Sequence, residues 1–137
     1  MDIRPYSPTD RDACLEIFDS NLPQTSRPLF ESFLDGAPVS FYVAEHDSKI
    51  VACGGFEISG ETARLQWGMV HSKWQRQGLG RFLLFYRLRE ITRTAAVQMV
   101  NLECPRQAVP FFASQGFREV SGGGSEAVMV KRLAVCP

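Results

Sequence analysis

Apolar residues recur at helical spacing in four stretches of the chain, and they alternate or run together in seven others. The helical spacing predicts helices from about residue 8 to before Pro23, and at 28–34, 78–93 and 107–115. The remaining stretches predict strands at 2–6, 41–45, 49–58, 62–70, 97–103, 117–121 and 127–133. Turns fall at 46–48, at 59–61 and at the glycine run 122–124.

The resulting order of elements is βααβββαβαββ. It predicts one α/β domain over residues 1–137, with a mixed, mostly antiparallel sheet and helices on both of its faces. No internal repeat and no linker interrupts this order. The helix at 78–93 has two apolar stripes, so one of them is free to meet another element or a second subunit. The stripes are Leu79, Phe82, Leu83 and Tyr86, and Leu84, Leu88 and Ile91.

Composition narrows the function classes. The chain has 137 residues, is 45% hydrophobic, and balances 15 basic against 15 acidic residues. It can bury a core, and it has no overall charge that favours nucleic acid or an anionic membrane. We expect a cytoplasmic protein, because no run resembles a signal or a membrane span. Four scattered cysteines, at 14, 53, 104 and 136, predict buried reduced thiols, and no residue spacing predicts a metal site.

The stretch from Arg64 to Arg81 has the strongest functional signal. A strand leads into a basic turn that contains Gly78 and Gly80, and a long helix follows. Glycines let the backbone approach a ligand closely, and the first turn of a helix offers unpartnered N–H groups and a favourable dipole for an anion. With Arg76 and Arg81 nearby, the junction is predicted to bind a phosphate.

Two better-known glycine loops do not fit this stretch. A dinucleotide fingerprint needs a third glycine where Leu83 stands, and a Walker A loop needs Lys and Ser or Thr where Arg81 and Phe82 stand. A glycine-rich turn without any ligand remains the plain alternative.

Two motifs resemble the GNAT N-acetyltransferase superfamily. Gln75-Arg76-Gln77-Gly78-Leu79-Gly80 matches its acetyl-CoA motif, Gln/Arg-x-x-Gly-x-Gly/Ala, directly after a strand. The stretch 108–117, with the pair Phe111-Phe112 followed by Gly116-Phe117, resembles its second signature. The order of elements matches the family over nearly the whole chain. The resemblance implies an acetyl-CoA-dependent N-acetyltransferase.

The resemblance also implies where the cofactor lies. The sheet would splay at the cofactor cleft, where the pantetheine arm would pair with a bulged strand near its end. Backbone N–H groups of the loop would hold the pyrophosphate, with the side chains of Gln75, Arg76 and Arg81 secondary. The implied cofactor-binding residues are Met69, Val70, Gln75, Arg76, Gln77, Gly78, Leu79, Gly80, Arg81 and Phe112.

The catalytic residues depart from the family pattern. A tyrosine commonly protonates the leaving thiolate, but Phe112 occupies that position here. Solvent, Ser114 or Cys104 could supply the proton instead, and Cys104 could also be a nucleophile or simply a packed thiol. Glu57 is the candidate general base, with Glu103 and a water chain as alternatives.

The acceptor is expected to approach over the segment from Phe18 to Phe33, whose aromatic residues could equally belong to the core. Few acidic residues lie there, which disfavours a polycationic acceptor and leaves a small amine, an amino acid or a peptide. A non-catalytic acyl-CoA-binding module is the alternative function. A partner-binding domain with an interface at Phe85 and Leu88 is the third, and the protein is expected to be a monomer or a homodimer.

Overall fold

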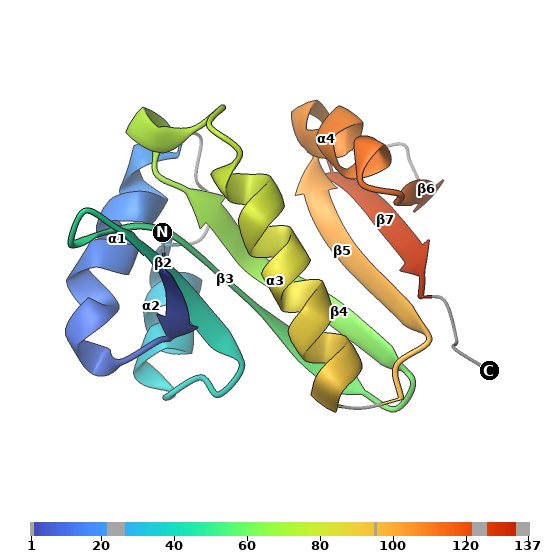
Figure 1. Cartoon of the computed structure of the whole chain (residues 1–137), viewed down its shortest axis with the longest axis horizontal. Coiled ribbons are helices and arrows are strands. Elements are labelled where there is room, and N and C mark those ends of the chain that lie inside the picture. The colour runs from blue at the N-terminus through green and yellow to red at the C-terminus, as the bar shows by residue number, and fades with distance from the viewer. Residues whose placement is uncertain (1, 22–26, 95, 122–125, 134–137) are drawn as a thin grey trace. The chain divides into compact units, whose positions relative to one another are not determined.

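The computed structural model describes residues 2–21, 27–94, 96–121 and 126–133. Its elements follow the predicted order (Figure 1). The strands are β1 Asp2–Pro5, β2 Phe41–His46, β3 Lys49–Ser59, β4 Thr62–Val70, β5 Met99–Pro105, β6 Arg118–Ser121 and β7 Glu126–Arg132. The helices are α1 Arg11–Ser20, α2 Arg27–Asp35, α3 Leu79–Thr94 and α4 Val109–Ser114. The predicted loop at Gly122–Gly124 and Cys136 lie outside the described residues.

The strands form one seven-stranded mixed sheet in the order β1-β2-β3-β4-β5-β7-β6. β4 and β5 are parallel, and the connection between them contains α3, which gives the length that a parallel connection needs. The fold class is therefore as predicted, an α/β fold with a mixed sheet. Contacts within the chain divide it into two compact units: residues 1–55 with 67–88, and residues 56–66 with 89–137. The single domain over 1–137 stays a prediction.

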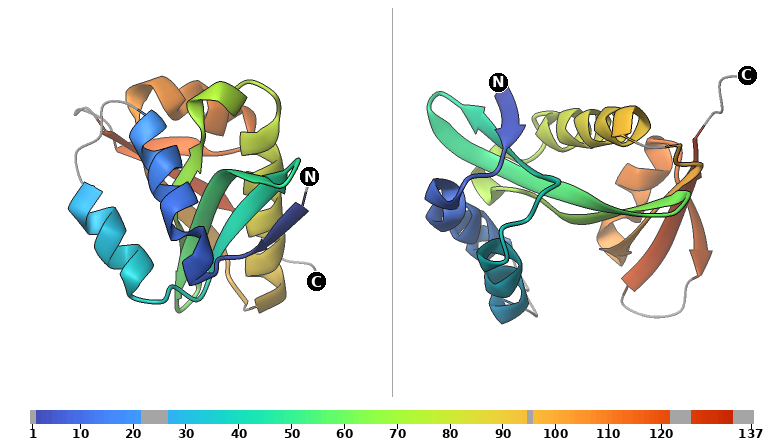
Figure 2. Two further views of the ribbon diagram at one scale, coloured as in Figure 1. Left: turned by 90° about the vertical axis from the view of Figure 1, so that its left-hand side faces the viewer. Right: turned by 90° about the horizontal axis from the view of Figure 1, so that it is seen from below.

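In the first unit, helices cover both faces of the sheet (Figure 2). Phe41 and Val43 of β2 and Cys53 of β3 pack with α1 and α2. Ala44 and Ala52, which are next to Val43 and Cys53 in the sequence, point to the other face and pack with Leu83 of α3. This alternation follows from the two-residue period of a strand, because neighbouring side chains project to opposite faces.

In the second unit, β5 is the central strand. It pairs in parallel with β4 from Thr62↔Met99 to Arg64↔Asn101, and antiparallel with β7 along its whole length. The strand begins two residues later than predicted, because the N–H groups of Gln98 and Met99 bond to the carbonyl of Glu61. These bonds tie the end of the α3–β5 connection to the β3–β4 turn.

The α4 region is shorter than the predicted helix at 107–115. A 3-10 turn at Arg106–Ala108 precedes it, and Pro110 falls in the first turn of α4, where its missing N–H leaves no bond unmade. Gly116 ends the helix with a φ of 92°, as predicted for a glycine at that position. The ammonium group of Lys131 donates to the carbonyl of Gln115 at 2.8 Å and completes the end of the helix.

A partly buried ion pair lies just before α1. The Asp10 carboxylate accepts two hydrogen bonds from the Arg4 guanidinium, at 2.8 and 2.9 Å, and one from the backbone N–H of Ser7. Asp10 is only 5% exposed, so these bonds replace water around the carboxylate. The hydrogen bonds from Arg4 lower the pKa of Asp10, against the opposing effect of burial.

We predict that Asp10→Asn lowers the free energy of unfolding by about 1–2 kcal/mol at pH 7, because the amide accepts fewer charge-assisted bonds and Arg4 is partly exposed. The pKa of Asp10 is lower in the folded than in the unfolded protein. Its stabilising effect is therefore present at neutral pH and is lost as the pH falls through the folded pKa. Urea unfolding at pH 7 and near pH 3 measures both effects. Asp12→Asn, at an exposed position of α1, is the control, and an equal effect of the two substitutions would contradict the prediction.

Candidate functional site

The end of β4 has a kinked backbone. Trp67 has a φ of 56°, which a large side chain rarely adopts, and it therefore marks a bulge in β4. The bulge was expected from the family resemblance. Met69 and Val70 follow it and are half-buried. The N–H of His71 bonds to the carbonyl of Val51 on β3, so the N–H of Val70 points away from β3 by the alternation of an antiparallel pair.

Side chains from two other segments hold the last carbonyl of β4. The carbonyl of Val70 accepts from the amide of Asn21 at 3.1 Å and from the amide of Gln75 at 3.0 Å. Gln75 also donates to the Asn21 side chain at 2.9 Å, and the N–H of Ser72 donates to the hydroxyl of Ser20 at 3.0 Å. The side chain of Gln75 thus braces the loop. Both lone pairs of the Val70 carbonyl are used, so its N–H is the group that Val70 can offer to a ligand.

The loop before α3 has the backbone of an anion-binding nest. Arg76 and Gly78 have positive φ values of 64° and 82°, and left-handed residues in a turn can direct backbone N–H groups toward an anion. The N–H of Phe82 is bonded to the carbonyl of Gly78 at 3.0 Å, which is the first bond of the α3 helix. The N–H groups of residues 79–81 therefore precede the helical ladder and are available to a phosphate.

Space and charge at this nest also suit a phosphate group. A Cβ built on Gly78 would meet no atom within 4 Å, so the backbone there is open to a ligand. Arg76 and Arg81 are exposed, and in the described part of the chain no ion pair is recorded for either. Gln77 is exposed as well, whereas Leu79 and Gly80 are half-buried. The structure thus brings together the predicted loop residues in a form that fits a pyrophosphate.

Phe112 lies on α4 and is half-buried. Its ring packs edge-on against Phe111 and Phe117, with ring centroids 5.0 and 5.6 Å apart. The nearby hydroxyl of Ser114 donates to the carbonyl of Phe111 at 2.6 Å, so its proton is held within the helix. Cys104 is 4% exposed, and burial raises the pKa of its thiol, which favours the packed thiol over a nucleophile.

The two candidate bases differ in their surroundings. Glu57 is exposed on β3, and among the described residues no ion pair is recorded for it. The carboxylate of Glu103 lies 3.8 Å from the guanidinium of Arg64, with both side chains more than half exposed. Among the described residues, Glu103 thus has an arginine beside it, and Glu57 has none recorded.

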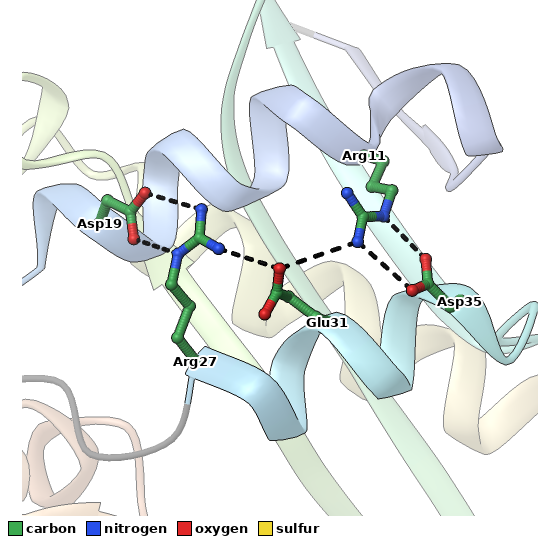
Figure 3. Close-up of polar contacts among 5 residues, drawn as sticks. All are labelled: Arg11, Asp19, Arg27, Glu31 and Asp35. Atoms are coloured by element: carbon green, nitrogen blue, oxygen red, sulfur yellow. Dashed lines mark hydrogen bonds and ion pairs between the residues drawn. The ribbon is translucent and has the colours of Figure 1, made fainter.

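The helices α1 and α2 carry the segment predicted to face the acceptor. Phe18 and Phe30 are 3% and 0% exposed and stack with centroids 5.2 Å apart, so they belong to the core. The acidic residues of this segment are paired with arginines (Figure 3). Arg27 binds Asp19 and Glu31 at 2.8 and 3.0 Å, and in the same network Arg11 binds Asp35 at 2.7 Å.

Some common kinds of site are not found. In the described ranges, no group of three or more His, Cys, Asp or Glu side chains is placed to hold a metal ion. No helix in these ranges is long and apolar enough to cross a membrane.

Sequence patterns missed two residues next to this region. Asn21 fell at the end of the helix predicted to stop before Pro23 and had no expected role, yet its amide reaches β4 across 49 positions of the chain. Arg87 lies in the buried face of α3 with Leu83 and Leu84. A signal for Arg87 was present, since it stands three or four positions from both leucines, but a charged residue in an apolar stripe is usually assigned to the surface.

Comparisons with known proteins agree with this geometry. Residues 37–119, more than half of the chain, match the family model described as "Acetyltransferase (GNAT) domain". Comparison with curated proteins finds none that matches the sequence.

Solved structures match the fold at low sequence identity. The ribosomal-protein-S18-alanine N-acetyltransferase from Escherichia coli is 23% identical, with a TM-score of 0.84 over 99% of this chain and 96% of that one. PaiA N-acetyltransferase from Thermoplasma acidophilum, in complex with coenzyme A, is 18% identical, with a TM-score of 0.78 over 96% and 98%. N-acetylglutamate synthase from Neisseria gonorrhoeae, complexed with coenzyme A and L-arginine, is 19% identical, with a TM-score of 0.76, and matches 96% of this chain but 33% of that one.

The fold, the loop before α3 and the family match all lead to the same assignment. The chain belongs to the GNAT acetyltransferase family.

Proposed function

We propose that the protein is an acetyl-CoA-dependent N-acetyltransferase that acts on a small amine, an amino acid or a peptide. The observation that carries the proposal is the nest from Arg76 to Gly78 at the start of α3. Its positive φ values, open Gly78 and exposed arginines match what a pyrophosphate requires. Family membership supports acetyl-CoA-dependent acetyl transfer in general. A cytoplasmic location belongs to the same proposal, because three of the cysteines are buried and free.

Direct transfer needs few side chains. The neutral amine attacks the thioester carbonyl, the bond from carbon to sulfur breaks, and the amine loses one proton while the thiolate gains one. Holding both substrates together can contribute about 7–11 kcal/mol to lowering the barrier. The N–H of Val70 points away from β3 and is suited to donate to the thioester oxygen.

In this proposal, Glu57 or a water molecule takes the proton from the amine. No tyrosine stands at Phe112 to protonate the thiolate, so solvent protonates it. Thiols have a pKa of about 8.5, so the thiolate is an adequate leaving group at neutral pH. We therefore expect turnover that is slow for the family rather than absent.

The charges on α1 and α2 indicate which acceptors the protein would bind. In the predicted segment, the carboxylates of Asp19 and Glu31 are both paired with Arg27, and Phe18 and Phe30 belong to the core. In the described part of the segment from Phe18 to Phe33, no carboxylate is left unpaired for a polycationic acceptor. This favours an acceptor with one amine and little additional positive charge.

Phe112 motivates a second candidate function, a non-catalytic acyl-CoA-binding module. A panel of amines, amino acids and short peptides, assayed with acetyl-CoA for release of free thiol, separates the two functions. We expect at least one acceptor to be acetylated. Tight binding of acetyl-CoA in calorimetry without turnover of any acceptor would favour the binding module instead, and no binding at all would reject both.

A further inference from the structure

Arg87 is a buried cation on α3. Its side chain lies on the inner face of α3 and is 4% exposed. Among the described residues no ion pair involves it, and its Nε has no hydrogen-bond partner. Its one recorded bond is from Nη1 to the carbonyl of Gly55, at 3.2 Å. Burial lowers the pKa of Arg87 to about 10, which shows how poorly this environment solvates the charge.

Two glycines on the sheet make room for this guanidinium. A Cβ on Gly54 of β3 would lie 3.1 Å from Cζ of Arg87, and a Cβ on Gly68 of β4 would lie 2.8 Å from Nη2. Any larger residue at Gly68 would displace the guanidinium. The chain thus omits side chains at two sheet positions so that a charged group from α3 can lie against the backbone of both strands.

Gly68 directly follows the bulge in β4. The Trp67 ring is held on the opposite face of the sheet, 4.9 Å from Phe30 and 5.8 Å from Phe33 between centroids. The carbonyl of Trp67 also accepts from the Cys53 thiol at 3.7 Å. The kink thus has aromatic rings packed on one face and the Arg87 guanidinium close to Gly68 on the other. A non-glycine residue with positive φ persists only where its surroundings enforce it.

A purely structural role does not explain this arrangement. A buried, unpaired charge is costly, and apolar residues of similar volume often stabilise a protein when they replace such groups. An apolar residue at position 87, with small residues at 54 and 68, would pack the same layer at lower cost. The guanidinium lies close to Gly68, at the start of the segment that leads into Met69 and Val70, and this placement points to a use for the charge beyond packing.

We propose that Arg87 is a positioning residue, whose guanidinium holds the Trp67–Gly68 bulge and thereby orients the backbone of Met69 and Val70 toward the pantetheine arm of coenzyme A. The inference rests on the proposed function, because it concerns the same cofactor. Arg87 itself does not touch the ligand. It acts through the backbone of Gly68.

Two ligands separate this role from the phosphate nest. Coenzyme A reaches both the nest and β4, whereas 3′-phospho-ADP, which is coenzyme A without its pantetheine arm, reaches only the nest. For Arg87→Met we expect the dissociation constant of coenzyme A to rise about tenfold, equivalent to one or two hydrogen bonds, with no change for 3′-phospho-ADP. The melting temperature should stay equal or rise, because the unpaired charge is removed. Arg87→Lys keeps the charge but not the planar fork. Its dissociation constant for coenzyme A should lie between those of the wild type and Arg87→Met.

Arg89→Met is the matched control, because Arg89 is exposed on the same helix. It should change neither affinity. Folded Arg87→Met that binds coenzyme A like the wild type, or that loses both ligands equally, would overturn the inference. If Arg87→Met does not fold, the same comparison of ligands on Arg87→Lys decides. Failure of the wild type to bind coenzyme A would instead reject the proposed function.

Amide hydrogen exchange tests the bulge without any ligand. In the free protein, the amides of residues 68–70 should exchange faster in Arg87→Met than in the wild type, and Arg89→Met should leave them unchanged. Equal exchange in Arg87→Met and the wild type would show that Arg87 does not hold the bulge, and would also overturn the inference.

Discussion

Replacing Gly78 by glutamate is expected to weaken the binding of acetyl-CoA by about 100-fold. The new carboxylate would extend from the nest into the open space beside Gly78, where the pyrophosphate is proposed to lie. Two like charges about 4 Å apart repel by about 1–4 kcal/mol near a protein surface, and each 1.4 kcal/mol is a factor of ten in affinity. The φ of 82° adds strain for any side chain. Calorimetry with acetyl-CoA measures the change.

Two substitutions serve as controls for Gly78→Glu. Gly78→Ala brings the same backbone strain without charge, and it should weaken binding far less. Gly60→Glu places the same side chain at another glycine with positive φ and open space, in the β3–β4 turn, and it should leave binding unchanged. Unchanged affinity in Gly78→Glu would show that the nest does not hold the cofactor.

Phe112→Tyr is expected to raise kcat for acetyl transfer by about 100-fold, the lower end of the usual effect of a general acid. The substitution adds a hydroxyl to a half-buried ring and keeps its edge-on packing on Phe111 and Phe117. The hydroxyl would supply the proton that the leaving thiolate otherwise takes from solvent. The measurement is the rate of thiol release with an acceptor that the wild type acetylates.

Phe111→Tyr is the control for this gain, because it adds the same hydroxyl to the neighbouring ring, which is 36% exposed. It should leave kcat unchanged. The affinity for acetyl-CoA should be the same in both variants and the wild type. Equal rates in Phe112→Tyr and the wild type would mean that protonation of the thiolate does not limit the reaction.

The hydrogen bonds from Asn21 and Gln75 to the carbonyl of Val70 show how the loop before α3 is held. The family resemblance placed Gln75 among the cofactor-binding residues, as a side chain of secondary importance. In the structure its amide joins Val70 to Asn21, so it supports the site through the end of β4. The residues that bind and the residues that position are thus neighbours in the same short motif.

The sequence alone predicted the order of elements and the glycine-containing phosphate loop, whereas the departure at Phe112 came from the family resemblance. These features are local, because strand alternation, helix spacing and the conformations that Gly78 and Gly116 require are properties of neighbouring residues. The boundaries that shifted, such as the later start of β5, depend on bonds to Glu61, far away in the sequence. Local patterns do not contain that information.

Only the tertiary structure decided which of the ambiguous side chains are buried and which residues they contact. Phe18 and Phe30 proved to be core because α1 and α2 close over the sheet, and Arg87 proved to be buried because Gly54 and Gly68 lie opposite it. Each of these facts depends on residues brought together from distant parts of the chain. The physical reason is that burial, and the cost of a buried charge, are set by all the neighbours of a group and not by its place in a periodic pattern.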